Sequence, residues 1–317
     1  MARVLRCVAV IGAVFAALLL QVPQAAAWGP EAHRAIGLIA DKVLQKNDAP
    51  AHQKLEALLQ SDKENRLTKT DIASEATWAD ILRDRSQEAR FATSNWHAVR
   101  LRPDSPDISA ACSGHKPLPE GYPASHGPQD NCVVDKILQF ERELQNPDTS
   151  SGEKLAAVQF LLNLVADVND PLLAIDHGDQ GGACTAVQIG AKPPVRLSTY
   201  WETTLVGEVV GRDPVGGAAR ILASISPADA QKWAAGDPES WALESHEVAK
   251  TVVYGFPADA GAGKYTFPGS RGAEESCGEA TLYRVGADYE TKALAAAKQQ
   301  LAKGGIRLFQ VLGSSFK

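Results

Sequence analysis

Residues 153–167 read EKLAAVQFLLNLVAD, and this stretch decides the class of fold. Apolar side chains occur on every side of a helix drawn through it, which is typical of a helix buried in a protein core. Asn163 and Asp167 are one helical turn apart, so they share one face of this apolar helix. A buried carboxylate is costly unless it is paired or bound to a metal. Taken alone, a helix cap or an arginine partner for Asp167 is the commoner explanation.

Helical patterns continue on both sides of this stretch. Apolar residues recur at helical spacing over residues 31–44, 71–85, 132–144 and 279–312, the last with a break at Gly304-Gly305. Ser226-Pro227 and Asp237-Pro238 mark the beginnings of two further helices, the second running to Tyr254. A strand pattern is clearest at residues 186–189, and Gly- and Pro-rich surface loops are expected at 103–131, 176–195 and 257–278. We therefore predict a mainly α fold, a single helical domain with long loops.

The composition is that of an ordinary globular protein. The chain has 317 residues, of which 44% are hydrophobic and 22% charged, and this excludes collagen-like, disordered and coiled-coil proteins. Its formal net charge of −6 argues against nonspecific adhesion to duplex DNA. A polyanionic substrate would need metal cations or a few well-placed arginines.

The first 27 residues have the layout of a secretory signal. Arg3 and Arg6 precede an apolar run from Val8 to Val22, and Ala25–Ala27 supply small residues before Trp28. A membrane anchor is the alternative, but the apolar run is short for a membrane span. We expect cleavage after Ala27, a mature domain over residues 28–317 without stable membrane association, and a secreted or periplasmic location. The pattern says nothing of oligomeric state.

Four cysteines remain after the leader, an even number that suggests two disulfides in an exported protein. Pairing Cys112 with Cys132 would close the loop between them and leave Cys184 for Cys277. The sequence alone leaves three pairings open.

Two further groups of residues could carry chemistry. Cleavage after Ala27 would give Trp28 a free amine, which could chelate a metal together with His33 five residues later. The alternative is that His33 is a surface residue, which is the commoner case for a histidine near a chain end. Asp80 and Arg83 lie three residues apart on the helix that begins near Trp78, and His97 follows in a Trp-His pair. A carboxylate beside an arginine suits phosphoester chemistry, although a surface ion pair is the commoner explanation.

Together these segments resemble the S1/P1 nuclease family, extracellular zinc-dependent nucleases whose distant relatives are zinc-dependent phospholipases C. The resemblance rests on the N-terminal Trp, His33, W-A-D-x-x-R, W-H and F-L-x-x-x-x-x-D. It extends to three more segments: Asp179-Gln180-Gly181-Gly182, Trp241-Ala242-Leu243-Glu244-Ser245 and Gly305-Ile306-Arg307-Leu308. It implies a mainly helical fold with three zinc ions clustered in a cleft.

Carried over residue by residue, the resemblance gives two zinc sites that share one carboxylate. The first would use the amine and carbonyl of Trp28 with His33 and Asp167. The second would use Asp80, His97 and the bridging Asp167, but Asn163 stands where the family has a fourth ligand, a histidine.

The third site departs further from the family. Leu173 and Ser198 replace histidines, and Glu202 replaces an aspartate. Leucine cannot bind zinc and serine rarely does, so we expect about one or two zinc ions rather than three. His177, in a loop beyond Leu173, could compensate. Arg100 stands where family members often carry Asp or Asn near the base pocket, and we expect His115, His126 and His246 to be non-catalytic.

The resemblance implies an exported zinc-dependent phosphodiesterase of endonuclease type, acting on single-stranded nucleic acid and weakened by the loss of a zinc site. Asp80 would orient or deprotonate the attacking water, and Arg83 would stabilise the phosphorane. Two alternatives stay open: an inactive pseudo-nuclease that binds nucleotides or nucleic acid, and a phospholipase C-like enzyme.

Overall fold

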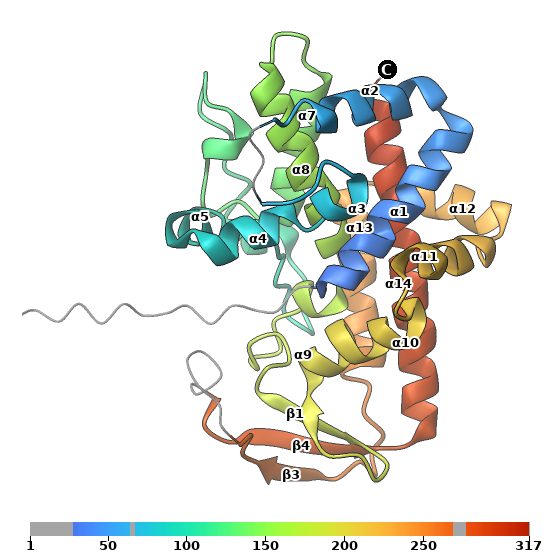
Figure 1. Ribbon diagram of the computed structural model, residues 1–317. Coiled ribbons are helices and arrows are strands. Elements are labelled where there is room, and N and C mark those ends of the chain that lie inside the picture. The colour runs from blue at the N-terminus through green and yellow to red at the C-terminus, as the bar shows by residue number, and fades with distance from the viewer. Residues whose placement is uncertain (1–27, 64–66, 269–276, 317) are drawn as a thin grey trace, which may run out of the picture.

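The computed structural model describes residues 28–63, 67–268 and 277–316, and the predicted leader lies outside the described residues. Helices form most of the molecule, and a small sheet lies at one end (Figure 1). The predicted mainly α fold is thereby confirmed. No helix in the described ranges combines the length and the apolar character that crossing a membrane requires.

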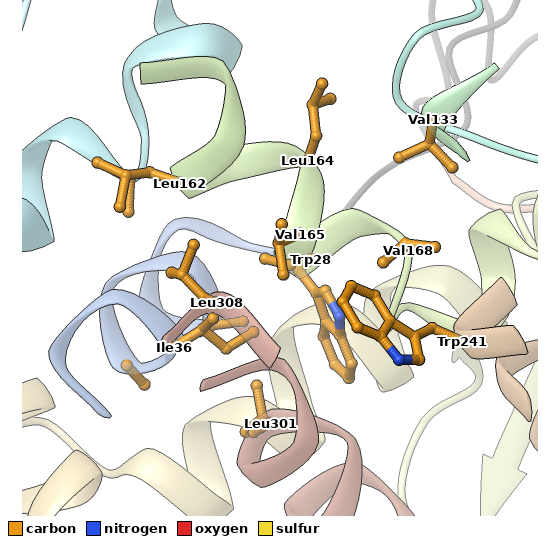
Figure 2. Close-up of a cluster of buried hydrophobic side chains, with 14 of the residues drawn as sticks. Trp28, Ile36, Val133, Leu162, Leu164, Val165, Val168, Trp241, Leu301 and Leu308 are labelled. Atoms are coloured by element: carbon orange, nitrogen blue, oxygen red, sulfur yellow. The ribbon is translucent and has the colours of Figure 1, made fainter. Parts of the chain in front are cut away.

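Helix α8 (Ser151–Asp167) lies in the centre of the helical part. The side chain of Ser150 caps its N-terminus by accepting a hydrogen bond from the backbone N–H of Glu153, and every residue from Ala157 to Asp167 is buried. It packs against α7 (Val133–Gln145), α14 (Ala287–Ser315) and α1 (Pro30–Asn47). Figure 2 shows side chains of α8 meeting side chains of α1 and α14 in one apolar cluster. The predicted buried helix is confirmed.

Helix α14 runs along α1 without interruption (Figure 1). The predicted break at Gly304-Gly305 is wrong, because these glycines serve close packing. A Cβ atom on Gly304 would lie 3.0 Å from Ile36 Cδ1, and one on Gly305 would lie 2.4 Å from Ile39 Cγ2. Glycine here allows the backbones of the two helices to approach.

The sheet has the strand order β2-β1-β4-β3. Strand β1 (Thr185–Ile189) confirms the predicted strand and pairs in parallel with β4 (Ala280–Val285), Thr185 opposite Thr281. Strands β2 (Val195–Arg196) and β3 (Ala262–Tyr265) pair antiparallel at the two edges. The predicted helix over 279–312 is therefore wrong in its first residues, which alternate between buried and exposed as a strand does.

Shorter helices complete the fold. The predicted helix over 71–85 is interrupted at Ala76 and Thr77, and the one expected to run to Tyr254 changes to a π-helix at Ala249. The remaining elements are α2 (Ala49–Gln60), α3 (Ile72–Glu75), α4 (Trp78–Arg85), α5 (Gln87–Ala92), α6 (Ile108–Ala111), η1 (Ala124–His126), η2 (Pro171–Leu173), α9 (Leu197–Thr199), η3 (Tyr200–Leu205), α10 (Val206–Val210), α11 (Pro214–Ala223), α12 (Pro227–Ala234), α13 (Pro238–Val248) and η4 (Ala249–Val253).

Two disulfides tie the long loops to these elements. Cys112 pairs with Cys132 at the N-terminus of α7, and Cys184, just before β1, pairs with Cys277, just before β4. The favoured pairing among the three possibilities is confirmed.

Candidate metal centre

Several segments bring polar side chains to one buried position. His33 lies in the first turn of α1 and Asp80 in the first turn of α4. His97 follows α5, while Asn163 and Asp167 come from the last turns of α8. Because α8 is the central helix, its one polar face meets the ends of α1 and α4.

Each of the predicted side-chain ligands lies within 3.6 Å of at least one other. His97 Nδ1 donates a hydrogen bond to Asp167 Oδ2 at 2.7 Å. His33 Nε2 is 3.5 Å from Asp80 Oδ2 and 3.6 Å from Asp167 Oδ1. The four side chains therefore form one cluster, in which the carboxylate of Asp167 lies between the two histidines.

Asn163 takes part in this cluster through its amide nitrogen. Its Nδ2 donates hydrogen bonds to Asp80 Oδ2 at 2.9 Å and to the carbonyl of Ala76 at 3.1 Å, and it lies 3.3 Å from His33 Nδ1. An amide N–H₂ group has no lone pair for a metal. Asn163 thus connects α8 to α4 through its amide group.

Many polar atoms of this centre are buried and have no hydrogen-bond partner in the described part of the chain. Buried polar groups are normally satisfied by protein or water, so a concentration of exceptions requires an explanation. The unpartnered atoms are His33 Nε2, Asp167 Oδ1, Asp170 Oδ2 and Glu202 Oε1, while the side chains of His97 and Asn163 interact with each other. Imidazole nitrogens and carboxylate oxygens are zinc ligands, so the atoms that lack a partner fit a bound cation.

Burial also sets the charge of these groups. It lowers the pKa of His33, and with the positive charge of Arg83 it lowers the pKa of His97 well below its ordinary value. Burial, followed by the charge of Asp80, raises the pKa of Asp167 well above its usual range. Neutral imidazole is the form that binds metals. Carboxylates that resist ionisation in this way would be stabilised by a neighbouring cation.

Trp28 places the start of α1 directly on this centre. The residue is buried, and its backbone N–H donates a hydrogen bond to the Asp170 carboxylate while its carbonyl accepts one from the His33 side chain. The N–H of Gly29 donates to the carbonyl of Glu202 at 3.2 Å. The backbone of residues 28–29 therefore lies among the same acidic groups that would hold a cation.

Asp170 is a member of the centre that sequence reasoning did not single out. Burial raises its pKa to about 7, and it also accepts a hydrogen bond from the N–H of Leu172. Glu202 lies near it on η3, and burial, followed by the charges of Asp170 and Asp167, raises the pKa of Glu202 well above its usual range. The sequence signal that could have identified Asp170 is its position, three residues after Asp167 and just beyond a buried helix.

The other two positions of the third predicted zinc site contain no strong ligand. Leu173 is buried in an apolar contact with Ala98. Ser198 is buried in α9, where its backbone N–H donates to the carbonyl of Gly182. The ring of His177, the suggested compensating ligand, stacks on Tyr254 with ring centroids 3.9 Å apart.

Arg83 lies beside the cluster with its side chain largely buried. Its Nη1 is 3.8 Å from Asp80 Oδ1, and its Nε has no hydrogen-bond partner in the part of the chain that the structure describes. Asp80 is the most accessible acid of the cluster, with 30% of its side chain exposed. Arg100 lies nearby with an exposed side chain, close enough to Arg83 and Asp176 to feel their charges. The buried guanidinium of Arg83 thus lies beside the most exposed carboxylate of the cluster.

A second group of potential donors lies elsewhere, at Cys112, His115 and Asp135. The sulfur of Cys112 is bonded to Cys132, so it offers no thiolate. His115 pairs with Asp135 at 2.7 Å. This group is an ion pair beside a disulfide rather than a zinc site.

Comparison with known proteins places the chain in a family. The S1/P1 Nuclease family matches residues 28–317, which includes every residue of the centre. The chain belongs to the S1/P1 nuclease family. It is also similar to Endonuclease 4 of Arabidopsis thaliana, with 24% identity over 298 residues that cover 91% of this chain and 89% of the relative. Membership in the S1/P1 nuclease family makes the chain a nuclease relative, and the match begins at Trp28, the residue at the start of the centre.

Proposed function

We propose that this S1/P1 nuclease family member is an exported zinc-dependent phosphodiesterase that cleaves single-stranded nucleic acid as an endonuclease. The observation that carries the proposal is the set of buried, unpartnered nitrogen and oxygen atoms beside Arg83. These atom types suit zinc, and an adjacent guanidinium suits a phosphate. The similarity to a protein named an endonuclease supports nucleic acid as the substrate.

The ligands present would hold about one or two zinc ions. One would be held by the Trp28 amine and carbonyl with His33 and Asp167. The other would be held by Asp80, His97 and the shared Asp167. Export is supported by the leader sequence, by the two disulfides and by a family match that begins at Trp28.

Bound zinc would supply Lewis acidity for the scissile phosphate and for the attacking water. Arg83 would bind a nonbridging phosphate oxygen and stabilise the charge that grows on it as the water oxygen bonds to phosphorus. The ester P–O bond to the leaving nucleoside oxygen would then break, and that oxygen would take a proton from solvent. Asp80, at the accessible side of the cluster, would accept the proton of the attacking water. The hydrogen bond from His97 to Asp167 fixes the imidazole, so the orientation of both groups is set before substrate binds.

A binding protein without turnover is the second candidate, and one observation favours it. Asn163 uses its N–H₂ group to hold Asp80, and Leu173 packs against Ala98, so two of the family's histidine positions have other tasks here. Such a protein would retain the metal and the nucleotide but not hydrolysis.

The two candidates are separated by assays on protein beginning at Trp28. We would measure cleavage of a single-stranded oligodeoxynucleotide and an oligoribonucleotide, with zinc and with excess chelator, and nucleotide binding by calorimetry. The proposal predicts cleavage that the chelator abolishes. Zinc-dependent nucleotide binding without cleavage would favour the binding protein, and cleavage of phosphatidylcholine vesicles alone would indicate the lipid enzyme.

A matched pair of variants assigns the activity to this centre. Asp80→Asn removes the proposed base. Asp41→Asn removes a carboxylate of α1 that is not part of the cluster and whose Oδ1 lies 2.9 Å from His52 Nε2. Loss of cleavage in Asp80→Asn but not in Asp41→Asn is expected. Equal activity in both would place the chemistry elsewhere.

A further inference from the structure

The turn that follows Asp167 is held by side chains that do not belong to the metal centre. Asp167 ends α8, and residues 168–170 turn into η2, with the N–H of Asp170 donating to the carbonyl of Asp167 at 2.9 Å. The two acids at the ends of this turn both face the centre. Their positions therefore depend on the two residues between them, Val168 and Asn169.

Side chains from α13 and α14 hold both of these residues. Ser245 Oγ donates to the carbonyl of Val168 at 2.7 Å, and Gln300 Nε2 donates to the carbonyl of Asn169 at 3.0 Å. Gln300 Nε2 is also 3.2 Å from Ser245 Oγ, so the two contacts support each other. Both side chains are fully buried.

Arg307 holds the Asn169 side chain. Its Nη1 donates to Asn169 Oδ1, while Asn169 Nδ2 donates to the carbonyl of Val165 at 2.7 Å. The guanidinium is therefore connected, through one amide, to the last turn of α8. Such a connection restricts the end of the helix that carries Asp167.

The charge of Arg307 is balanced within the same group. Its Nη2 donates to Glu244 Oε2, and its guanidinium lies 5.3 Å from the centre of the Trp241 ring. Trp241, Glu244 and Ser245 belong to the W-A-L-E-S segment, and Arg307 to the G-x-R-L segment. These two segments resemble the family but contribute no residue to the metal centre. Both contact the turn that follows Asp167.

We propose that Ser245, Gln300 and Arg307 are positioning residues for the metal centre, acting through the turn between Asp167 and Asp170. The inference rests on the proposed function, because it assumes that Asp167 binds a metal. Metal and catalytic groups must be held within about 0.5 Å of a productive geometry. Residues that support metal ligands typically change metal affinity by about 10–100-fold when they are replaced.

The test compares variants on one helix. Gln300→Met removes the donor to Asn169 at similar volume, and Arg307→Met removes the donor to the Asn169 side chain. Lys303→Met is the matched control, because Lys303 also lies on α14 and contacts Glu244 at 3.2 Å but does not contact the turn. Ser245→Ala is the mildest change and guards against loss of folding in the others.

For each variant we would measure the zinc dissociation constant by chelator competition well below the unfolding temperature, the unfolding temperature of the metal-free protein, and kcat and KM for an oligonucleotide. We expect zinc affinity to fall by about tenfold or more in Gln300→Met and Arg307→Met, and by less in Ser245→Ala. Lys303→Met should lower the unfolding temperature without changing zinc affinity. A purely structural role would lower the unfolding temperature in all variants and leave zinc affinity unchanged.

The outcomes separate the two proposals. If the unaltered protein binds zinc and the turn variants bind it as tightly as Lys303→Met does, the positioning role is refuted alone. If the unaltered protein binds no zinc, the proposed function fails, and this inference fails with it.

Discussion

The centre has a ligand-rich half and a depleted half, which differ in how many of their buried polar atoms lack a hydrogen-bond partner. The ligand-rich half consists of Trp28, His33, Asp80, His97 and Asp167. It leaves several buried nitrogen and oxygen atoms without hydrogen-bond partners in the described ranges of the chain. Because unpartnered buried groups are costly, a bound cation would stabilise this arrangement.

The depleted half consists of Leu173, Ser198 and Glu202. Leu173 makes an apolar contact with Ala98, so its side chain leaves no buried polar atom that a cation would have to satisfy. Only Glu202 retains an unpartnered oxygen, and it lies near the other acids. The comparison teaches that neighbouring parts of one buried polar centre can differ in their need for a cation, because an apolar side chain such as Leu173 leaves no polar atom to satisfy.

The largest effect is expected from Asp167→Asn, because this carboxylate would serve both remaining metals. Zinc affinity and cleavage should both fall by at least about 100-fold, as measured by chelator competition and by an oligonucleotide assay. The metal-free variant should be at least as stable as the unaltered protein, because a buried carboxylate with a raised pKa has been removed. Full activity in Asp167→Asn would show that the ligand-rich half is not the metal site on which cleavage depends.

Arg83→Ala should separate phosphate recognition from metal binding. We expect kcat to fall by about 10²–10³-fold, because one donor to the developing charge is lost. Zinc content should not change, since the guanidinium is not a ligand. Loss of zinc in this variant would show instead that Arg83 supports the metal centre.

The free amine of Trp28 can be tested by adding one residue before it. A peptide nitrogen has no available lone pair, whereas an amine can coordinate, so zinc at the site with His33 should weaken by about tenfold or more. The comparison uses chelator titration of two proteins that differ only by an N-terminal Ala. Equal affinity would show that the chain terminus is not a ligand.

The smallest expected effect is a gain in the depleted half. The triple change Asn163→His, Leu173→His and Ser198→His should add bound zinc and raise cleavage above that of the natural chain. Recovery should be partial, because supporting contacts count for about 10–100-fold and Leu173 now packs against Ala98. A folded triple variant that gains neither zinc nor cleavage would favour the binding protein.

The fold was predictable where local pattern and tertiary packing agree. The apolar run of α8 is buried as its composition requires, and the strand at residues 186–189 lies inside β1. Prediction failed at Gly304-Gly305, because only contact with α1 reveals why glycine is needed inside a helix. It also failed at β4, whose pairing with a strand nearly a hundred residues earlier leaves no local signal.

The centre was predictable in its residues but not in its surroundings. His33, Asp80, His97 and Asp167 came from their resemblance to the family, and the structure places them together. Asp170 was missed, because its role depends on the backbone of Trp28 lying against it. Spacing along the chain could not show that contact.

Metal content tests the comparison of the two halves most directly. Elemental analysis of protein that begins at Trp28, after dialysis against trace zinc, should give about one to two zinc ions per chain. A parallel sample of Asp167→Asn should give close to none. Three tightly held zinc ions would contradict the account and would require a ligand such as His177 in the depleted half, whereas no zinc at all would remove its basis.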